Sequence, residues 1–311
     1  MSLLRLLVPV MSLTLLGYGL VSVWVRADSL LALLLELWPR ILQGLLLVLL
    51  SFGIKFSRWC LLLAALGQHP PLLANARIWM GSFAFTATPG KSGEAVRSLL
   101  LKQECEVPVP PTLMALVVER LTDAMSVLLI LLINFPLLMS WSVPITVPIA
   151  IGIIVVSSGW LVLSNRRVSG LLKTGAKRLL PLKLANAGAD GLSALRQLLR
   201  PGLLLQATAI GALAWSMEGV SLWLLLRGMD IDSVSIGGAT IAHTAAGLLG
   251  ALTLMPGGLG STEAGTVGLL ALQGVGVATA IPATLLIRLM TLWFATTLGV
   301  CCLLLPGRPS R

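Results

Sequence analysis

The chain has 311 residues, of which 57% are hydrophobic and only 11% are charged, and its formal net charge is +10. Soluble domains average about 25% charged residues. This composition therefore excludes an ordinary soluble protein and predicts an all-α integral membrane protein with a single membrane domain over residues 1–311. The four cysteines show no metal-ligand spacing, so we expect reduced thiols in the core.

The first half predicts two helices before any break in the apolar pattern. Residues 6–25 predict a first membrane span with a cytoplasmic N-terminus; a signal peptide is the alternative, although its apolar core is usually only about 7–15 residues long. A second helix is expected from about Ile41 to Lys55 and Arg58. We take these two cations as the cytoplasmic flank, with residues 59–66 continuing along the membrane interface.

Four further spans follow from the apolar runs. Residues 112–133 and 144–163 predict the third and fourth spans, and 203–226 and 282–305 predict the fifth and sixth. Between the fourth and the fifth, the stretch 165–201 holds eight lysines and arginines but a single acid, which predicts a cytoplasmic loop. Leucines alternate with these cations, so we expect an amphipathic helix at 166–200 on an anionic lipid surface. The basic C-terminus then lies in the cytoplasm.

Two glycine-rich breaks interrupt the apolar pattern. Pro89-Gly90 is followed by Gly93-Glu94-Ala95, and Pro256-Gly257 is followed by Gly258, Gly260 and Glu263-Ala264. Lipid offers no partner for the backbone groups that such breaks release, so the breaks must be buried in protein or line a wet cavity. Counting sides predicts that residues 68–111 enter and leave from the cytoplasm. By the same count residues 233–281 enter and leave from outside, so both are re-entrant hairpins.

The two halves also match beyond these breaks. Glu94 precedes Arg120 by 26 residues, and Glu263 precedes Arg288 by 25. The matched landmarks and the opposite predicted orientations indicate an inverted repeat of approximately 40–135 and 202–305. Many secondary transporters have this architecture, with the site at the repeat interface.

Charged residues within the predicted spans are the candidate site. Each costs about 2.5–3.5 kcal/mol in a lipid core, so they must pair or face water. A carboxylate gains only about 0.3–1 kcal/mol at a helix N-terminus, which favours a functional role for Glu94 and Glu263. A helix N-terminus and an arginine fork suit a phosphate. The candidate substrate-binding residues are Glu94, Arg97, Arg120, Gly257, Gly258, Gly260, Glu263 and Arg288, with Arg97 and Lys91 expected at a cytoplasmic entrance.

Several charged residues also have a purely structural interpretation. Glu119, Arg120 and Asp123 are one turn apart and could simply neutralise one another. Glu218 is expected to reach the membrane interface, and His69 and His243 are expected to be structural. No catalytic motif, metal site or cofactor site is predicted.

With these residues the chain resembles the lysylphosphatidylglycerol synthase transmembrane family, a flippase-like domain also found in AglD-like and hopanoid-associated membrane proteins. The matching residues are Arg58-Trp59, Pro89-Gly90, Gly93-Glu94, Arg97, Glu119-Arg120, Asp123, Trp215, Glu218, Pro256 to Gly260, Glu263 and Arg288. The resemblance implies a membrane domain that moves phospholipids, aminoacylated lipids or polyprenyl-linked lipids. The soluble aminoacyl-transferase domain of the lipid-aminoacylating members is not found in these 311 residues.

The sequence therefore predicts a translocase for a phosphate-headgroup lipid in the inner membrane rather than an enzyme. A membrane-embedded lipid or glycosyl transferase and a non-transporting scaffold for lipid synthesis are the alternatives. The expected partners are the membrane lipid substrate and the anionic lipid surface, with no nucleic acid; a homo-oligomer is left open.

Overall fold

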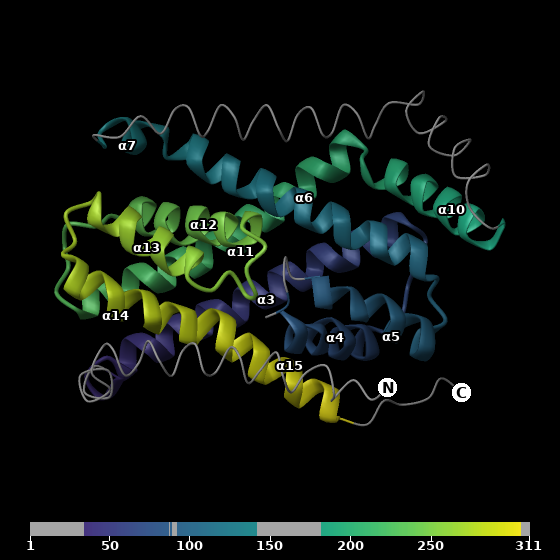
Figure 1. The fold of residues 1–311 in the computed structure, drawn as a ribbon, viewed down its shortest axis with the longest axis horizontal. Coiled ribbons are helices and arrows are strands. Elements are labelled where there is room, and N and C mark those ends of the chain that lie inside the picture. Colours follow the sequence, from purple (N-terminus) through teal and green to yellow (C-terminus); the bar gives the residue numbers. More distant parts are fainter. Residues whose placement is uncertain (1–33, 87, 89–91, 142–181, 306–311) are drawn as a thin grey trace.

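The computed structural model describes residues 34–86, 88, 92–141 and 182–305, and the elements it gives them are helices (Figure 1). The predicted spans at 6–25 and 144–163 and the first part of the basic loop lie outside these residues, as does Lys91. Three helical segments within the described part are long and apolar enough to cross a membrane: Trp38–Ala65, Pro201–Gly228 and Val277–Leu304. This is the composition expected of an integral membrane protein.

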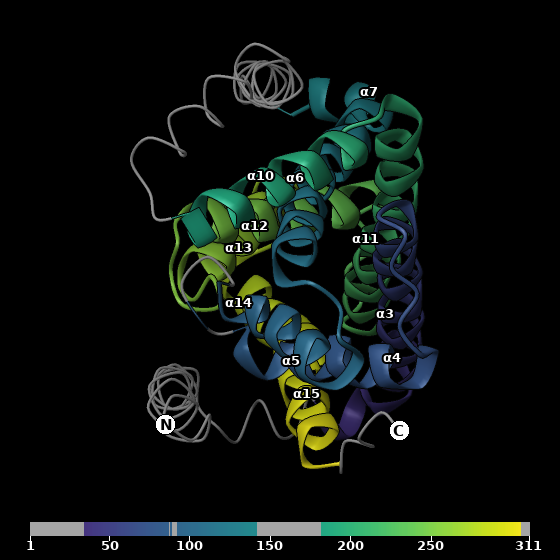
Figure 2. The ribbon, with the colours of Figure 1, turned by 90° about the vertical axis from the view of Figure 1, so that its right-hand side faces the viewer.

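The two longest helices, α3 (Trp38–Ala65) and α11 (Pro201–Gly228), run antiparallel and side by side (Figure 2). Gly228 lies against Leu37 near the start of α3, while Gly211 lies against Arg58 further along it. Residues after Lys55 and Arg58 continue this helix as expected, since α3 runs without a break to Ala65. An apolar stretch follows these cations, and its Trp59 is fully buried in the core.

The first hairpin surrounds the first glycine-rich break. Helix α4 (Leu72–Gly81) continues into a 3₁₀ turn, η1 (Ser82–Phe85), and the chain returns through η2 (Ser92–Ala95) into α5 (Val96–Cys105). The Thr88 hydroxyl accepts a hydrogen bond of 2.6 Å from the Gly93 N–H and so satisfies one of the donors at the start of the returning helix.

The second hairpin has the same order. Helix α12 (Ile236–Leu252) leads to the break, and α13 (Ser261–Ala271) returns from it. Figure 1 shows the two hairpins on opposite sides of the molecule, α4 and α5 on one and α12 and α13 on the other.

Each hairpin packs against the last long helix of the other half. The first lies against α15 (Phe294–Leu304), where a side chain at Gly299 would come within 2.4 Å of the Ala84 backbone nitrogen. The second lies against α6 (Val109–Ile133), where Ile241 of α12 packs with Val127 and Leu131. The two halves are therefore interlocked at these reciprocal contacts.

The remaining helices complete this frame. The short α7 (Phe135–Met139) follows α6, and α10 (Leu182–Leu198) leads to α11. Helix α14 (Val277–Arg288) continues through a π-helical turn, η3 (Leu289–Trp293), into α15. The predicted sixth span began at Pro282, but this proline lies inside α14. Membrane helices tolerate an interior proline because neighbouring groups satisfy the freed backbone carbonyl.

Two apolar cores lie on either side of the polar centre. One joins the C-terminal part of α3 to the first hairpin, with Trp59, Trp79 and Leu101 at its centre. The other joins α11 to the second hairpin and α14, with Leu225 and Leu286 fully buried. This division leaves the charged side chains of both halves between the cores.

Candidate functional site

A cavity of about 110 Å³ lies between the two hairpins, enough for several water molecules or one small headgroup. Its lining combines aromatic side chains with charged ones. The charged and titratable lining residues are Lys55, Arg58, Glu94, Glu119, Arg120, Asp123, Glu218, His243 and Arg288. The cavity is therefore a polar site inside an apolar helical protein.

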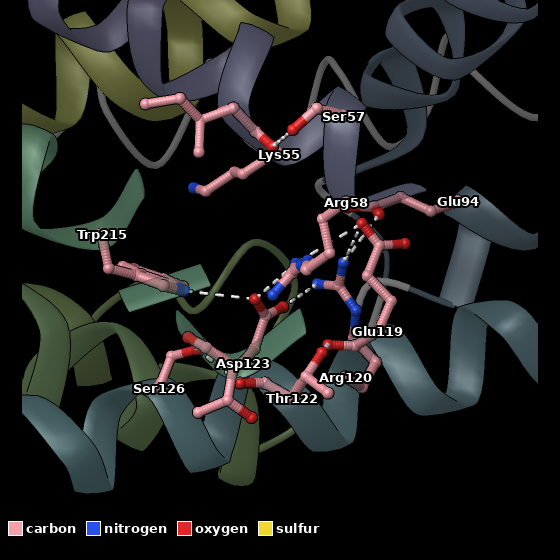
Figure 3. Close-up of polar contacts among 12 residues, drawn as sticks. Lys55, Ser57, Arg58, Glu94, Glu119, Arg120, Thr122, Asp123, Ser126 and Trp215 are labelled. Atoms are coloured by element: carbon pink, nitrogen blue, oxygen red, sulfur yellow. Dashed lines mark hydrogen bonds and ion pairs between the residues drawn. The ribbon is translucent and has the colours of Figure 1, made fainter. Parts of the chain in front are cut away.

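Arg58 of α3 and the two carboxylates of α6 form the buried base of this site (Figure 3). The guanidinium of Arg58 lies 2.7 Å from the Asp123 carboxylate and 3.6 Å from that of Glu119. Its side chain is only 1% exposed. A charge so deeply buried needs a partner to offset its desolvation. Arg58 therefore works inside the site, and its sequence interpretation as a membrane flank is corrected.

Arg97 also lies deeper than expected. Its side chain is fully buried, bridges the carboxylates of Glu94 and Glu119 at 3.0 Å each, and stacks on the Trp59 ring at 4.5 Å. The cavity lining does not include it. Its predicted place at an entrance is wrong, because its guanidinium is held between two carboxylates and an aromatic face.

Arg120 is the most accessible arginine of this group, with 35% of its side chain exposed. It contacts the carboxylate of Asp123 at 3.2 Å, that of Glu119 at 3.5 Å and that of Glu94 at 3.6 Å. Glu119 and Asp123 thus pair not only with Arg120 of their own helix but also with arginines of other elements. Local neutralisation along one helix accounts for only part of this network.

The second half holds a simpler pair. The Arg288 guanidinium donates to the Glu263 carboxylate at 2.7 Å and to the Gly257 carbonyl at 2.6 Å. Gly257, Gly258 and Gly260 have φ angles of 61°, 68° and 79°, which favour glycine, so the break can present its carbonyl to the arginine. A side chain at Gly258 would also come within 2.5 Å of the Thr262 hydroxyl.

The structure thus brings each glutamate against the arginine of its own half. Of the eight predicted site residues, Glu94, Arg120, Gly257, Gly258 and Arg288 line the cavity. The other three do not line it: Glu263 accepts a hydrogen bond from Arg288, Arg97 pairs with Glu94, and Gly260 directly precedes α13.

Sequence reasoning missed a third group on the same cavity. Glu218 is only 4% exposed and accepts from the Ser51 hydroxyl at 2.5 Å and from the Lys55 ammonium at 2.6 Å. His243 lies 3.1 Å from its other oxygen. The expectation that Glu218 reaches the membrane interface is therefore wrong. The sequence did contain a signal for this pair: Glu218 lies within one apolar run, and Lys55 lies well inside another.

Trp215 connects this third group to the base of the site. Its indole N–H donates to Asp123 at 3.2 Å, and the Lys55 ammonium lies 4.4 Å above its ring. The ion-paired cluster as a whole has five cations (Lys55, Arg58, Arg97, Arg120 and Arg288) and five carboxylates (Glu94, Glu119, Asp123, Glu218 and Glu263). With neutral His243 this cluster carries no net charge. Within the described residues no group of three or more His, Cys, Asp or Glu side chains could hold a metal.

Comparison with known proteins gives two findings. A family model described as "Lysylphosphatidylglycerol synthase TM region" matches residues 3–299. A "UPF0104 membrane protein" of Methanothermobacter thermautotrophicus is 32% identical over 90 residues, which cover 29% of this chain and 27% of that relative. The first match extends over almost the whole chain, whereas the chain spans only about a quarter of the curated relative.

Proposed function

Since this chain belongs to the lysylphosphatidylglycerol synthase TM region family, we propose that it moves a lipid with a phosphate-bearing headgroup between the leaflets of the inner membrane. One observation carries the proposal. A partly open cavity between two helical hairpins is lined by an arginine from each half, Arg120 and Arg288. Arginine binds phosphate with paired N–H donors.

The geometry favours these two arginines over the other two. Arg58 and Arg97 are nearly or fully buried among carboxylates and an aromatic ring, so a headgroup that enters the cavity reaches them less easily. Arg120 is about one-third exposed, and Arg288 donates one of its hydrogen bonds to a backbone carbonyl, that of Gly257. A phosphate that enters the cavity can replace such contacts at modest cost.

We further propose that the two hairpins are re-entrant and form an inverted repeat, with both termini in the cytoplasm. Antiparallel α3 and α11, the shared hairpin order and the reciprocal hairpin contacts support this arrangement. Each half would then open the cavity toward one leaflet in turn, while the acyl chains stay in the lipid. A headgroup could cross between Arg120 and Arg288 without meeting bare hydrocarbon.

The test is a leaflet-exchange assay on the full chain in vesicles of phosphatidylcholine and phosphatidylglycerol. Acyl-labelled phosphatidylglycerol, phosphatidylethanolamine and a polyprenyl phosphate serve as probes, and a membrane-impermeant quencher reports the outer leaflet. With the wild type, the quencher should reach more than half of at least one probe. With Glu94→Gln or Glu263→Gln, the quenched fraction should stay near that of protein-free vesicles.

Glu104→Gln is the matched control, because Glu104 pairs with Arg77 away from the cavity. It should exchange lipid like the wild type. Wild-type exchange in both cavity variants would remove these carboxylates from the mechanism. Failure of the folded wild type to move any probe would contradict the translocase and favour a scaffold.

A further inference from the structure

The strongest unassigned feature of the cavity is the group formed by Glu218, His243 and Lys55. The three side chains come from three helices, α11, α12 and α3, and each lines the cavity that also holds Arg120 and Arg288. Glu218 and His243 are 4% and 7% exposed. Neither belongs to the glutamate–arginine pairs through which we propose headgroup binding.

The hydrogen bonds of Glu218 fix how these groups can hold a proton. One carboxylate oxygen already accepts from Ser51 at 2.5 Å and Lys55 at 2.6 Å. The other oxygen faces the Nε2 atom of His243 at 3.1 Å. A ring nitrogen that faces a carboxylate is a stable place for a proton. Imidazole is also the side chain whose ordinary charge change falls between pH 5 and 8.

The charges around His243 explain why a proton would bind together with the headgroup. Charged groups from several helices line the cavity with His243 or pair with a lining residue: Lys55 of α3, Glu119, Arg120 and Asp123 of α6, Glu218 of α11, Arg288 of α14 and its partner Glu263 of α13. With Arg58, Arg97 and Glu94 they balance at five positive and five negative charges. A headgroup phosphate therefore brings one uncompensated negative charge into a buried site, where unpaired charge is strongly disfavoured.

A proton on His243 removes that excess. It adds one positive charge at the cavity wall when the phosphate adds one negative charge, and the complex returns to neutrality. By linkage, each ligand then strengthens the binding of the other by the same factor.

We propose that His243, held by Glu218, is a proton-binding site that takes up one proton with the phosphate headgroup and so couples lipid movement to a proton gradient. This inference rests on the proposed translocase function. No covalent step is involved: the proton adds to the imidazole from the aqueous phase and leaves it when the headgroup leaves.

The experiment uses the full chain in phosphatidylcholine vesicles with acyl-labelled phosphatidylglycerol and phosphatidylethanolamine in both leaflets. A pH difference of one unit is imposed across the membrane, first in one direction and then in the other. In the wild type the gradient should shift the leaflet distribution of phosphatidylglycerol, which brings one net negative charge, up to about tenfold, the limit for one coupled proton per lipid. Reversing the gradient should reverse the shift. Phosphatidylethanolamine balances its own phosphate with an ammonium and should show no shift.

The chain offers a matched control because it contains two histidines. His69 is exposed in the loop between α3 and α4, whereas His243 lines the cavity. His243→Gln retains a side chain that can donate to Glu218 but cannot titrate in this range. It should exchange lipid more slowly than the wild type, because the charge of the phosphate stays uncompensated, and its leaflet distribution at the end point should show no gradient-driven shift. His69→Gln should behave like the wild type.

The outcomes separate the two proposals. If the wild type exchanges phosphatidylglycerol but the gradient leaves the distribution of this lipid unchanged, proton coupling is wrong and the translocase stands. A gradient response that survives in His243→Gln also overturns the assignment of the proton to His243. If the wild type exchanges neither probe, the translocase and the coupling fail together for these headgroups. The wild-type reversal does not depend on how well the variant folds.

Discussion

The two halves of the molecule hold their glutamate–arginine pairs with different numbers of ionic partners. In the first, Glu94 and Arg120 belong to a network with Arg97, Glu119 and Asp123, most of it nearly buried. In the second, Glu263 and Arg288 form one pair, 19% and 10% exposed, supported by a backbone carbonyl. Nearly equal spacing in the sequence thus gives a glutamate–arginine pair in each half, but only in the first half do further ionic partners surround the pair. We infer that the first half anchors the site and the second adjusts.

The largest expected effect concerns the orientation of the two hairpins in the membrane, because each labelled position should react fully from one side and not at all from the other. Single cysteines at His69 and Glu106, at the ends of the first hairpin, should react with an impermeant reagent only from the cytoplasm. Cysteines at Ser233 and Leu272, at the ends of the second, should react only from outside. The four native cysteines are removed first. Labelling of both hairpins from the same side of the membrane would contradict the proposed inverted repeat.

The next largest effect concerns stability. Arg58→Met leaves the Asp123 carboxylate without its nearest cation and should cost about 3–5 kcal/mol of unfolding free energy. Arg288→Met should cost less, about 1.5–3 kcal/mol, because its pair is partly exposed. Thermal unfolding in detergent measures both.

A compensating variant serves as the control for Arg58→Met. Adding Asp123→Leu removes the carboxylate that lies 2.7 Å from the Arg58 guanidinium and should recover part of the loss. Equal losses at Arg58 and Arg288 would show that the two halves do not differ in rigidity.

The second break allows a matched test of its glycines. Gly258→Ala meets both a positive φ and the Thr262 hydroxyl at 2.5 Å, so it should cost about 2–4 kcal/mol. Gly260→Ala meets only the positive φ, with no atom within 4 Å of the added carbon, and should cost about 1 kcal/mol. Unfolding midpoints rank the two, and equal losses would mean that the close approach to Thr262 is unimportant.

The smallest expected effect is on affinity. Arg120→Lys and Arg288→Lys keep the charge but lose the paired donors, so each should weaken phospholipid binding about tenfold while insertion is unaffected. Titration of the purified variants with phosphatidylglycerol measures this. Unchanged affinity in both variants would mean that the positive charge is sufficient for recognition and that the planar guanidinium group is not required.

The sequence predicted the helix–break–helix hairpins and the glutamate–arginine pairs because glycine-rich breaks and charged residues are unusual within an apolar chain. It misplaced Lys55, Arg58 and Glu218. Cations inside an apolar run resemble a cytoplasmic flank, and the local pattern does not show that the buried Arg58 side chain turns inward to Asp123 of α6. The partner of Glu218 lies 163 residues away in the chain. Contacts at that separation depend on how α3 and α11 meet.

The central claim is that one arginine from each half holds a lipid phosphate, and bound lipid tests it most directly. The full chain is purified in mild detergent, and native mass spectrometry counts the phosphate-bearing lipid retained per protein. Wild type and the Arg77→Gln control should retain at least one such lipid, since Arg77 pairs with Glu104 outside the cavity. The double variant Arg120→Gln/Arg288→Gln, folded and monodisperse, should retain less than a tenth as much. Equal lipid in that double variant would contradict the account.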